Sequence, residues 1–312
     1  MQVFGHEEIE ARLDWPGLIA ALRQDFAVAA TTAPARQVLD IELPGGEIAS
    51  LLIMPAWEGG KAIGVKVVTF FPGNAAKGKA TINAGMLMFD GADGHFTAAL
   101  DGDAITARRT AAASALAADY LARKDARTLL VVGTGQLALS VAEAHACVRD
   151  YDHVLIWGRS AQKAQIVADT LSARGLPATP CTDLETGCRA ADVITSVTAS
   201  TVPMIKGAWL KPGSHLDLIG AFKSDMRESD SAAIIDAQVF VDGRAGAVLA
   251  GDLAQPIAEG TFHPDRIAAD LTELAQGTHP GRQSETERTV FKSVGLSQED
   301  LTAAYEVISR DG

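Results

Sequence analysis

The chain has 312 residues, a formal net charge of −12 and a hydrophobic fraction of 47%. This length exceeds the size at which one hydrophobic core usually stops growing, so two domains are expected, with one very large domain as the alternative. The acidic balance argues against a general affinity for nucleic acid or anionic membranes, because both require a basic surface. The apolar content, combined with few aromatic residues, is typical of helices packed closely on a parallel sheet.

The cysteines give no sign of a metal site or a disulfide framework. Cys147, Cys181 and Cys188 lie at no metal-ligand spacing, and their odd number favours buried or inert thiols in a reducing compartment. The first residues lack a basic stretch followed by an apolar run, and no segment approaches the roughly 18 apolar residues that cross a bilayer. We therefore expect a cytoplasmic protein whose partner is neither a membrane nor a nucleic acid.

The first hundred residues predict a helix followed by mostly antiparallel strands. Apolar residues at helical spacing from Leu18 to Phe26 predict an amphipathic helix over 15–30, and Asp14 and Pro16 are its entry signals. Strand-like runs follow, separated by turns rich in glycine, proline and aspartate. These predicted strands cover residues 37–43, 47–54, 63–71, 81–89 and 96–100.

The pattern changes after an alanine-rich helix expected over residues 104–124. Strands then alternate with helices, which is typical of a doubly wound parallel sheet. The predicted strands cover residues 128–132, 153–157, 193–196, 214–219 and 239–241. The predicted helices cover residues 136–148, 161–173 and, at the end of the chain, 296–308.

A glycine-rich loop, Gly133-Thr134-Gly135-Gln136-Leu137-Ala138, joins a predicted strand to a predicted helix. In this context Gly133 permits a tight turn, Gly135 lets the backbone approach a pyrophosphate, and Ala138 is small enough for close packing of helix on strand. Unpaired N–H groups and the helix dipole at the helix start favour phosphate charge. The alternative is an ordinary glycine-rich turn, but the order of strand, loop, helix and strand predicts a nicotinamide dinucleotide site.

The choice of cofactor depends on the end of the next predicted strand. A carboxylate there would accept hydrogen bonds from a ribose 2′-hydroxyl and repel a 2′-phosphate. Gly158 stands at this place, Arg159 follows with a planar donor suited to phosphate, and Ser160 and Lys163 stand at the next helix start. The pattern favours NADP, with NAD as the alternative if Arg159 and Lys163 are only solvated surface charges.

A further segment, Val197-Thr198-Ala199, follows the predicted strand that ends at Ser196. Ligands of doubly wound folds bind at the carboxyl edge of the sheet, so these three residues are candidate cofactor contacts. His145, on a predicted helix, and His153, beside a strand start, are interpreted as structural or solvent-facing. His215, at the start of an interior strand, is ambiguous.

Several segments with recognisable motifs follow one another along almost the whole chain: Gly64–Val68 with Phe71–Asn74, Arg109–Ser114, the Gly133 loop, Gly251–Leu253 and Val290–Gly295. In this order they resemble the ornithine cyclodeaminase and mu-crystallin family. The resemblance implies an α/β fold with a Rossmann dinucleotide-binding domain over residues 111–289. It also implies an α+β substrate-binding and dimerisation domain over residues 1–110 with 290–312.

The resemblance implies that Arg36, Lys66 and Arg109 hold a substrate carboxylate, with Lys66 and Arg109 as the catalytic residues. A carboxylate is a planar anion that a guanidinium fork fixes well, and a lysine near the reduced bond adds charge or a proton. Lys66 lies in an apolar strand, where a buried cation needs a partner; the alternative is an outward, solvated lysine. Arg108 competes with Arg109 for this role, and Arg23 with Arg36.

One residue departs from the family's pattern. In cyclodeaminases and related alanine dehydrogenases, the resemblance implies an Asp in the turn after the strand near the nicotinamide, and this chain has Phe222 there. Asp225 would replace that Asp only if the loop were shifted, and Asp-x-Arg more often caps a helix start. Phe222 would instead pack against the ring or the substrate's methylenes. Ser293, in the last motif, would contact substrate or nicotinamide.

Family members without this Asp resemble reductases of cyclic ketimines. A protonated imine is already electrophilic, so the protein needs only to position it and neutralise its carboxylate. We therefore expect an enzyme that uses NADPH to reduce Δ1-pyrroline-2-carboxylate or Δ1-piperideine-2-carboxylate to proline or pipecolate, as a homodimer. The alternatives are ornithine cyclodeaminase activity, alanine dehydrogenase-like activity and a non-catalytic NADP-binding protein of the mu-crystallin type.

Overall fold

The computed structural model describes residues 1–309 and divides the chain into two compact units. Unit 1 comprises residues 1–109 together with the described chain from residue 296 onward, and unit 2 comprises Thr110–Gly295. Unit 1 is therefore built from two segments that are far apart in the sequence. The long helix α3 (Gly102–Leu121) begins in unit 1 and continues into unit 2.

The start of unit 1 is more regular than the sequence predicts. A short strand β1 (Gln2–Phe4) and a helix α1 (His6–Arg12) precede the predicted helix, which is α2 (Trp15–Val28). The side chain of Asp14 caps α2 by accepting from the N–H of Gly17 at 2.8 Å. The helix ends two residues earlier than expected because Ala29 takes a left-handed conformation with φ 53°.

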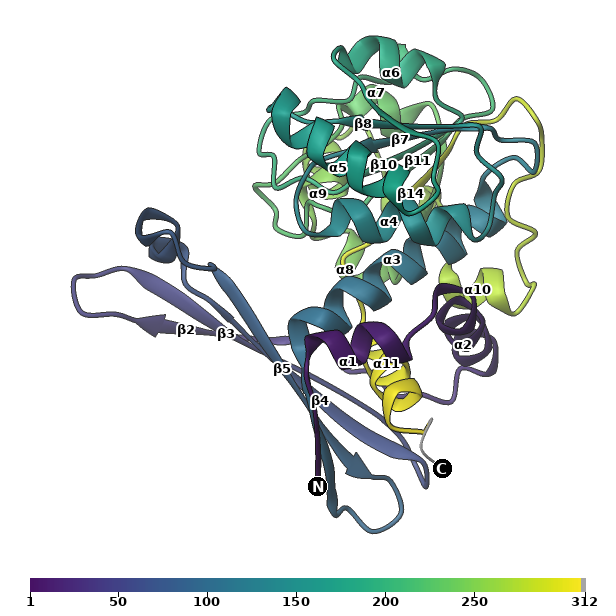
Figure 1. Cartoon of the computed structure of the whole chain (residues 1–312). Helices are drawn as coiled ribbons and strands as arrows, with labels where there is room; N and C mark the ends of the chain where they lie inside the picture. Colours follow the sequence, from purple (N-terminus) through teal and green to yellow (C-terminus); the bar gives the residue numbers. More distant parts are fainter. Residues whose placement is uncertain (310–312) are drawn as a thin grey trace. The chain divides into compact units, whose positions relative to one another are not determined.

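The five predicted strands of unit 1 and β1 form one six-stranded sheet (Figure 1), in the order β1-β6-β5-β4-β3-β2. Neighbours from β2 to β6 are antiparallel, whereas β1 is parallel to β6. The meander is therefore as expected, with one added edge strand. Its strands are β2 (Gln37–Glu42), β3 (Ile48–Glu58), β4 (Ala62–Phe70), β5 (Ile82–Asp90) and β6 (Phe96–Asp101), with a 3-10 turn η1 (Pro72–Lys77) between β4 and β5.

The final helix α11 (Ser297–Ser309) packs on one face of this sheet, against β3 and β4. Its apolar side chains, including Leu301 and Val307, are buried. Gly64 of β4 makes room for this packing, because a Cβ there would lie 2.9 Å from Cδ1 of Leu301. The helix predicted over residues 296–308 thus becomes part of the core of unit 1.

Unit 2 is built on an eight-stranded sheet in which every pair is parallel, in the order β13-β12-β14-β11-β10-β7-β8-β9 (Figure 1). From β7, the next two strands in sequence, β8 and β9, are added on one side, and β10 and β11 are added on the other side. This change of side between β7 and β10 is typical of a Rossmann fold. The strands are β7 (Thr128–Val132), β8 (His153–Trp157), β9 (Ala178–Pro180), β10 (Val193–Ser196), β11 (His215–Leu218), β12 (Gln238–Val241), β13 (Ile267–Asp270) and β14 (Thr289–Lys292). The expected fold class is confirmed.

Helices connect the strands of unit 2. The first two, α4 (Leu137–Ala146) and α5 (Ala161–Ala173), are the ones that the sequence predicts, although α4 begins one residue later and ends two residues earlier than expected. The others are short and were not predicted: α6 (Leu184–Ala190), η2 (Gly207–Trp209), α7 (Ser231–Ile235), α8 (Arg244–Ala247), α9 (Gly251–Ala258), η3 (Pro264–Arg266) and α10 (Leu271–Ala275).

The domain boundary expected from the sequence assigns residues from 290 onward to the substrate-binding domain, and this assignment is wrong for the strand β14. This strand pairs with β11 on one side and β12 on the other, so it lies inside the parallel sheet of unit 2. Its segment is short and contains a lysine, Lys292, which weakens any strand signal in the sequence. The chain passes back to unit 1 only after Gly295.

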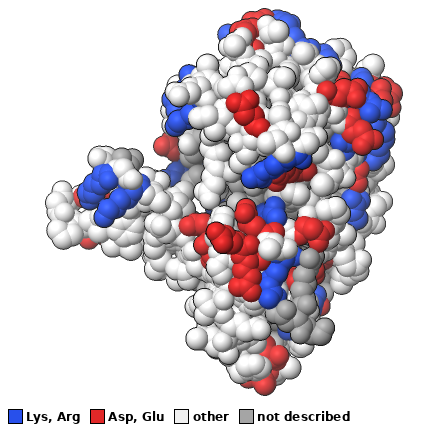
Figure 2. Space-filling view, in the orientation of Figure 1, with Lys and Arg blue, Asp and Glu red and all other residues white. Residues whose placement is uncertain are grey.

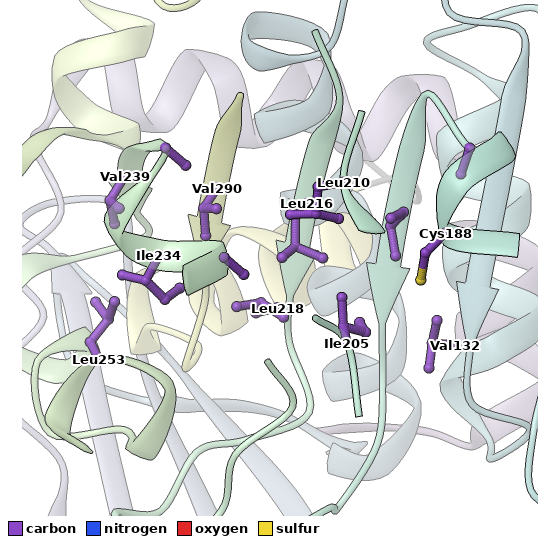
Figure 3. Packing of buried hydrophobic residues seen from close by; sticks show 14 of the residues in the cluster. Val132, Cys188, Ile205, Leu210, Leu216, Leu218, Ile234, Val239, Leu253 and Val290 are labelled. Atoms are coloured by element: carbon purple, nitrogen blue, oxygen red, sulfur yellow. The ribbon is translucent and has the colours of Figure 1, made fainter. Parts of the chain in front are cut away.

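The core of unit 2 forms where neighbouring strands point side chains toward one layer of short helices (Figure 3). The strands contribute Val132, Leu216 and Val290, and the helices contribute Ile234 and Leu253. Burial of aliphatic side chains of this kind stabilises a fold by roughly 1.5–3 kcal/mol each. Both faces of a parallel sheet are usually covered, which is why its strands are apolar almost throughout.

The thiols are only partly as expected. All three cysteines are free, but Cys188 is buried, Cys181 is partly buried and Cys147 is exposed. Cys147 is the residue after the last turn of α4, and its side chain lies outside the core. Burial raises the pKa of Cys188 to about 12 and also raises that of Cys181, so these two thiols resist ionisation.

Among the described residues, no helix is long and apolar enough to cross a membrane. Acidic and basic side chains are interspersed over the face seen in Figure 2, and no basic patch dominates it.

Candidate active site

The carboxyl ends of five strands lie in register along one edge of the parallel sheet. Trp157 is paired with Val132, Val132 with Ser196, Ser196 with Leu218, and Leu218 with Lys292. The loops that follow these residues are consequently neighbours in unit 2. They contain most of the residues that the sequence singled out as cofactor contacts, which the fold therefore brings together at this edge.

Gly133 occupies the tight turn after β7, as its motif predicts. Its φ is 130°, and a Cβ there would lie 2.9 Å from Cγ2 of Val197. Its N–H donates to the carbonyl of Trp157 at 2.9 Å. Only glycine fits this backbone, which passes against the loop after β10 at the point where the strand order reverses.

The start of α4 has the features of a phosphate cradle. Gly135 is exposed, and a Cβ there would meet nothing within 4 Å, so the backbone borders open space. Gln136 and Leu137 begin the helix, and the side chain of Gln136 makes no capping hydrogen bond. Ala138 is buried where the helix approaches the sheet. The residues thus fit a dinucleotide pyrophosphate, with its charge at a helix start.

Gly158 contacts Thr134 closely at the end of β8. A Cβ at residue 158 would lie 2.6 Å from Cγ2 of Thr134, so an acidic side chain would fit only after Thr134 moved. Arg159 is exposed next to it, and Ser160 caps α5 by accepting from the N–H of Lys163 at 3.3 Å. Neither Arg159 nor Lys163 has a side-chain hydrogen bond or ion pair within residues 1–309, so both cations remain available to a ligand.

A buried glutamate that the sequence did not single out joins two of these loops. Oε1 of Glu228 accepts from Ser196 Oγ at 2.6 Å and from the N–H and Oγ1 of Thr198 at 2.8 and 2.9 Å. Oε2 accepts from the N–H groups of Gly220 and Ala221 at 2.7 and 3.2 Å. Glu228 therefore fixes the loop after β10 to the loop after β11.

Further buried charges support Glu228. Oδ1 of Asp252 accepts from the N–H groups of Glu228 and Ser229 at 2.8 and 3.1 Å. Oδ2 of Asp252 forms an ion pair with Nζ of Lys292 at 3.2 Å, and Lys292 also donates to the carbonyl of Leu218 at 3.1 Å. Asp252 lies in the family motif Gly251–Leu253, the signal that could have identified this group.

Ser293 is buried beside another carboxylate. Its Oγ donates to Oδ2 of Asp242 at 3.2 Å, and that oxygen also accepts from the N–H groups of Val294 and Gly295 at 2.7 and 2.6 Å. Burial raises the pKa of Asp242, and these N–H groups act in the opposite direction. Ser293 is therefore held by its own loop, and its contact with a substrate stays a prediction.

Phe222 follows β11 and is 37% exposed, a large fraction for an aromatic side chain. Nζ of Lys223 lies 5.9 Å from the centre of its ring. Asp225 is exposed in a turn, and no helix begins there, so its expected capping role is wrong. The cap of the next helix is Asp230, which accepts from the N–H of Ala233.

In unit 1, Lys66 and Arg109 bind the same carboxylate on helix α11. Nζ of Lys66 lies 2.7 Å from Oδ1 of Asp300 and 3.2 Å from Oγ1 of Thr106. Nε of Arg109 donates to the same Asp300 oxygen at 2.8 Å, and Nη1 donates to Glu299 at 2.8 Å. We call these five residues the cation cluster. Glu299 and Asp300 were missed in the sequence, where they look like an ordinary acidic helix start.

Burial changes the acidity of the cation cluster. It lowers the pKa of Lys66 to about 8, an effect that Arg109 strengthens and Asp300 opposes. Burial also acts to lower the pKa of Arg109, but Asp300 and Glu299 outweigh it and raise that pKa. Lys66 is only 1% exposed, so the alternative of an outward, solvated lysine is wrong.

The two competing arginines have different surroundings. Arg108 stacks 4.0 Å above the ring of Trp15 and donates to the carbonyl of Glu10 at 2.7 Å, whereas Arg109 joins the cation cluster. Arg36 directly precedes β2 and is half-buried. The structure thus brings Lys66 and Arg109 together, and a shared role for Arg36 stays a prediction.

The histidines divide by burial. His145 is buried in unit 2 with Nε2 2.7 Å from Ser114 Oγ, and Ser114 also donates to Asp217. His215 is buried with Nδ1 2.9 Å from Thr289 Oγ1, and burial lowers its pKa well below the usual value. His153 is exposed. These contacts give His145 and His215 partners inside the core of unit 2.

Comparison with known proteins relates the chain to one family over almost its full length. The model of the ornithine cyclodeaminase/mu-crystallin family matches residues 3–311. A Δ1-pyrroline-2-carboxylate reductase of Paracoccus denitrificans is 38% identical over 305 residues, covering 97% of this chain and 95% of the relative.

Solved structures agree with this relationship. The Δ1-pyrroline-2-carboxylate reductase of Thermococcus litoralis in complex with NADH and L-proline has a TM-score of 0.92 at 29% identity, covering 98% of this chain and 96% of the other. An archaeal alanine dehydrogenase dimer with bound NAD has a TM-score of 0.92 at 28% identity, covering 100% and 97%. The resemblance seen in the sequence motifs is confirmed, and this chain belongs to the ornithine cyclodeaminase/mu-crystallin family.

Proposed function

We propose that this chain is a nicotinamide-dependent oxidoreductase that reduces a cyclic ketimine carboxylate, Δ1-pyrroline-2-carboxylate or Δ1-piperideine-2-carboxylate, to proline or pipecolate. The observation that carries the proposal is Phe222 at the sheet edge, where cyclodeaminases and alanine dehydrogenases of the family are expected to have an Asp. Without that carboxylate, the chain lacks the obvious group to activate an amine. The similarity to two reductases of this substrate class supports the same conclusion.

The required chemistry is modest. A reduced nicotinamide, when bound, supplies a hydride for the imine carbon. The protein must neutralise the substrate carboxylate and keep the imine nitrogen protonated. Arg109 uses Nε and Nη1 within the cation cluster, which leaves Nη2 for a carboxylate, and Lys66 has a third N–H beyond its two bonds. We assign carboxylate binding to Arg109, Lys66 and Arg36, the residue that directly precedes β2.

We further propose NADP as the preferred dinucleotide. Gly158 provides no acid for a ribose hydroxyl, and Arg159 and Lys163 are exposed cations beside that place. The two similar structures contain NADH and NAD, which makes NAD the alternative. Arg159 separates the two cofactors, because only a 2′-phosphate gives its guanidinium a charged partner.

A homodimer is proposed from the sheet of unit 1. Alternate residues of its strands face away from α11, and Ile53, Val65 and Leu87 lie on this outer side, with Leu87 38% exposed. An exposed apolar sheet face of this kind is typical of an association surface. The related alanine dehydrogenase is a dimer.

The test is a substrate comparison with purified protein. Each imine is offered with NADPH or NADH, ornithine with NAD, and pyruvate plus ammonia with NADH, while the reduced nicotinamide is followed by absorbance and ammonia by its release. Rapid cofactor oxidation with an imine is expected, and no ammonia from ornithine. Ammonia release without net cofactor consumption would overturn the proposal in favour of a cyclodeaminase, and activity with pyruvate in favour of an alanine dehydrogenase. Dinucleotide binding without any turnover would favour the non-catalytic alternative.

A further inference from the structure

The carboxylate of Glu228 is surrounded by hydrogen-bond donors from two loops. Ser196 and Thr198 belong to the loop after β10, and Gly220 and Ala221 to the loop after β11. Three of the five bonds come from backbone N–H groups, which cannot reverse their role and accept a hydrogen. Both oxygens of Glu228 must therefore act as acceptors.

These loops form the wall that faces the glycine-rich turn. Val197, between Ser196 and Thr198, is the residue that a Cβ on Gly133 would strike. Gly220 approaches the same loop so closely that its own Cβ would lie 2.0 Å from the carbonyl oxygen of Thr198. Fixing Thr198 and Gly220 therefore fixes the wall on which the dinucleotide would lie.

We propose that Glu228 is a positioning residue of the dinucleotide site, which holds both loops when ionised and loosens them when protonated, so that cofactor affinity depends on pH. This inference rests on the proposed nicotinamide-dependent function. In this proposal, the buried carboxylate of Glu228 controls cofactor binding through the two loops, without touching the cofactor or the substrate itself.

The charged groups that face Glu228 place its titration near neutrality. Burial, followed by the adjacent carboxylate of Asp252 on α9, raises the pKa of Glu228 to about 7. Lys292 of β14 and the donors Ser196 and Thr198 act in the opposite direction. Because the folded pKa lies above the ordinary value for Glu, the ionised form that binds all five donors is complete only above about pH 7.

Glu228→Gln is the minimal change that tests this role. An amide replaces one acceptor oxygen with an NH2 group of nearly the same shape. In one orientation the NH2 faces the N–H of Thr198, and in the other it faces the N–H groups of Gly220 and Ala221. At least one backbone donor, partly or fully buried, then loses its partner, a change that typically weakens the arrangement by a factor of about ten.

The experiment measures two quantities between pH 6 and pH 9: hydrogen exchange of the amides of Thr198, Gly220 and Ala221 in ligand-free protein, and NADPH affinity by fluorescence titration. In the wild type, the protection factors of these amides, which are corrected for the base-catalysed rise of intrinsic exchange with pH, and the affinity for NADPH should both rise about tenfold as the pH passes 7. Glu228→Gln should exchange fast and bind weakly at every pH. Ser196→Ala, which removes one donor and keeps the carboxylate, should retain the pH dependence. Glu185→Gln, at a side chain of α6 that is 44% exposed, is the matched control and should behave as the wild type.

Wild-type protection and a wild-type pH profile in Glu228→Gln would overturn the inference. If Glu228→Gln does not fold, the wild-type exchange series decides alone, because protection factors at the three amides that are independent of pH contradict the proposal. A wild type that binds no dinucleotide overturns the proposed function as well. A wild type that binds NADPH with this pH dependence but reduces no imine supports the role of Glu228 and refutes only the substrate assignment.

Discussion

At the scale of single residues, Lys66 combines burial with two oxygen partners. Water is excluded from its ammonium group, which lowers its pKa to about 8 even though Asp300 lies 2.7 Å away. A lysine with this pKa is mostly charged at neutral pH and can lose its proton in a mildly basic solution. Lys66 is expected to attract the substrate carboxylate by its charge and to supply a proton. It loses both abilities together when it is deprotonated as the pH rises.

The pH dependence of activity follows from this residue. We expect kcat/KM for the imine to fall as the pH rises through about 8, since neutral Lys66 neither attracts a carboxylate nor donates a proton easily. The folded pKa of Lys66 lies below its unfolded value, so between pH 8 and 10.5 its titration by itself favours the folded state. A loss of activity between pH 8 and 10.5 is therefore not caused by unfolding that follows from the titration of Lys66. Unfolding followed by circular dichroism over the same range is the check, and a flat kcat/KM profile would contradict the role of Lys66.

Arg159 provides a prediction about the cofactor. We expect Arg159→Ala to weaken NADPH binding by about 1.5 to 3 kcal/mol, the range for hydrogen bonds to charged groups, and to leave NADH binding nearly unchanged. Dissociation constants from fluorescence titration measure both. Arg189→Ala, an equal change of charge on the exposed face of α6, serves as control. Equal losses for the two cofactors would show that Arg159 does not contact the 2′-phosphate.

At the scale of elements, the loop between β7 and α4 contains two glycines with different constraints. Gly133 has a φ of 130° and almost touches Val197, whereas Gly135 has open space where a Cβ would be. Backbone strain at the first position is therefore a property of the folded protein itself. The constraint at the second arises only when a pyrophosphate occupies that space.

The two alanine substitutions should separate these constraints. Gly133→Ala should lower the free energy of unfolding by about 1–3 kcal/mol and also weaken dinucleotide binding. Gly135→Ala should weaken dinucleotide binding but leave stability within about 0.5 kcal/mol of the wild type. Urea unfolding and cofactor titration of both variants test this. If Gly135→Ala bound NADPH as well as the wild type, the cofactor would not approach this part of the loop.

Several elements of unit 2 were predictable because local periodicity determines them. β7, β8, β10 and α5 have the predicted bounds. β9, β13 and β14 were missed. β9 has three residues and ends in a proline, and β14 contains a lysine, which is buried because it pairs with Asp252 and the carbonyl of Leu218. The helices between them are too short to show a helical period.

At the scale of the whole molecule, the apolar outer side of the sheet in unit 1 provides a prediction about assembly. We expect a dimer in sedimentation velocity and a shift toward monomer in Leu87→Glu, because a charge would be buried in the association surface. Ile166→Glu, at a residue of α5 that is 58% exposed, is the matched control and should stay dimeric. A wild-type monomer, or a dimer unaffected by Leu87→Glu, would contradict this surface.

The sequence by itself determined the loop Gly133–Ala138, the absence of an acid at Gly158 and the order of the family motifs, because each of these depends on neighbouring residues. Only the tertiary structure showed that Lys66 and Arg109 share Asp300, which lies 234 and 191 positions away along the chain. It likewise showed that Glu228 joins two loops. Contacts between distant segments depend on how strands and helices pack, and no local pattern of residues records that packing.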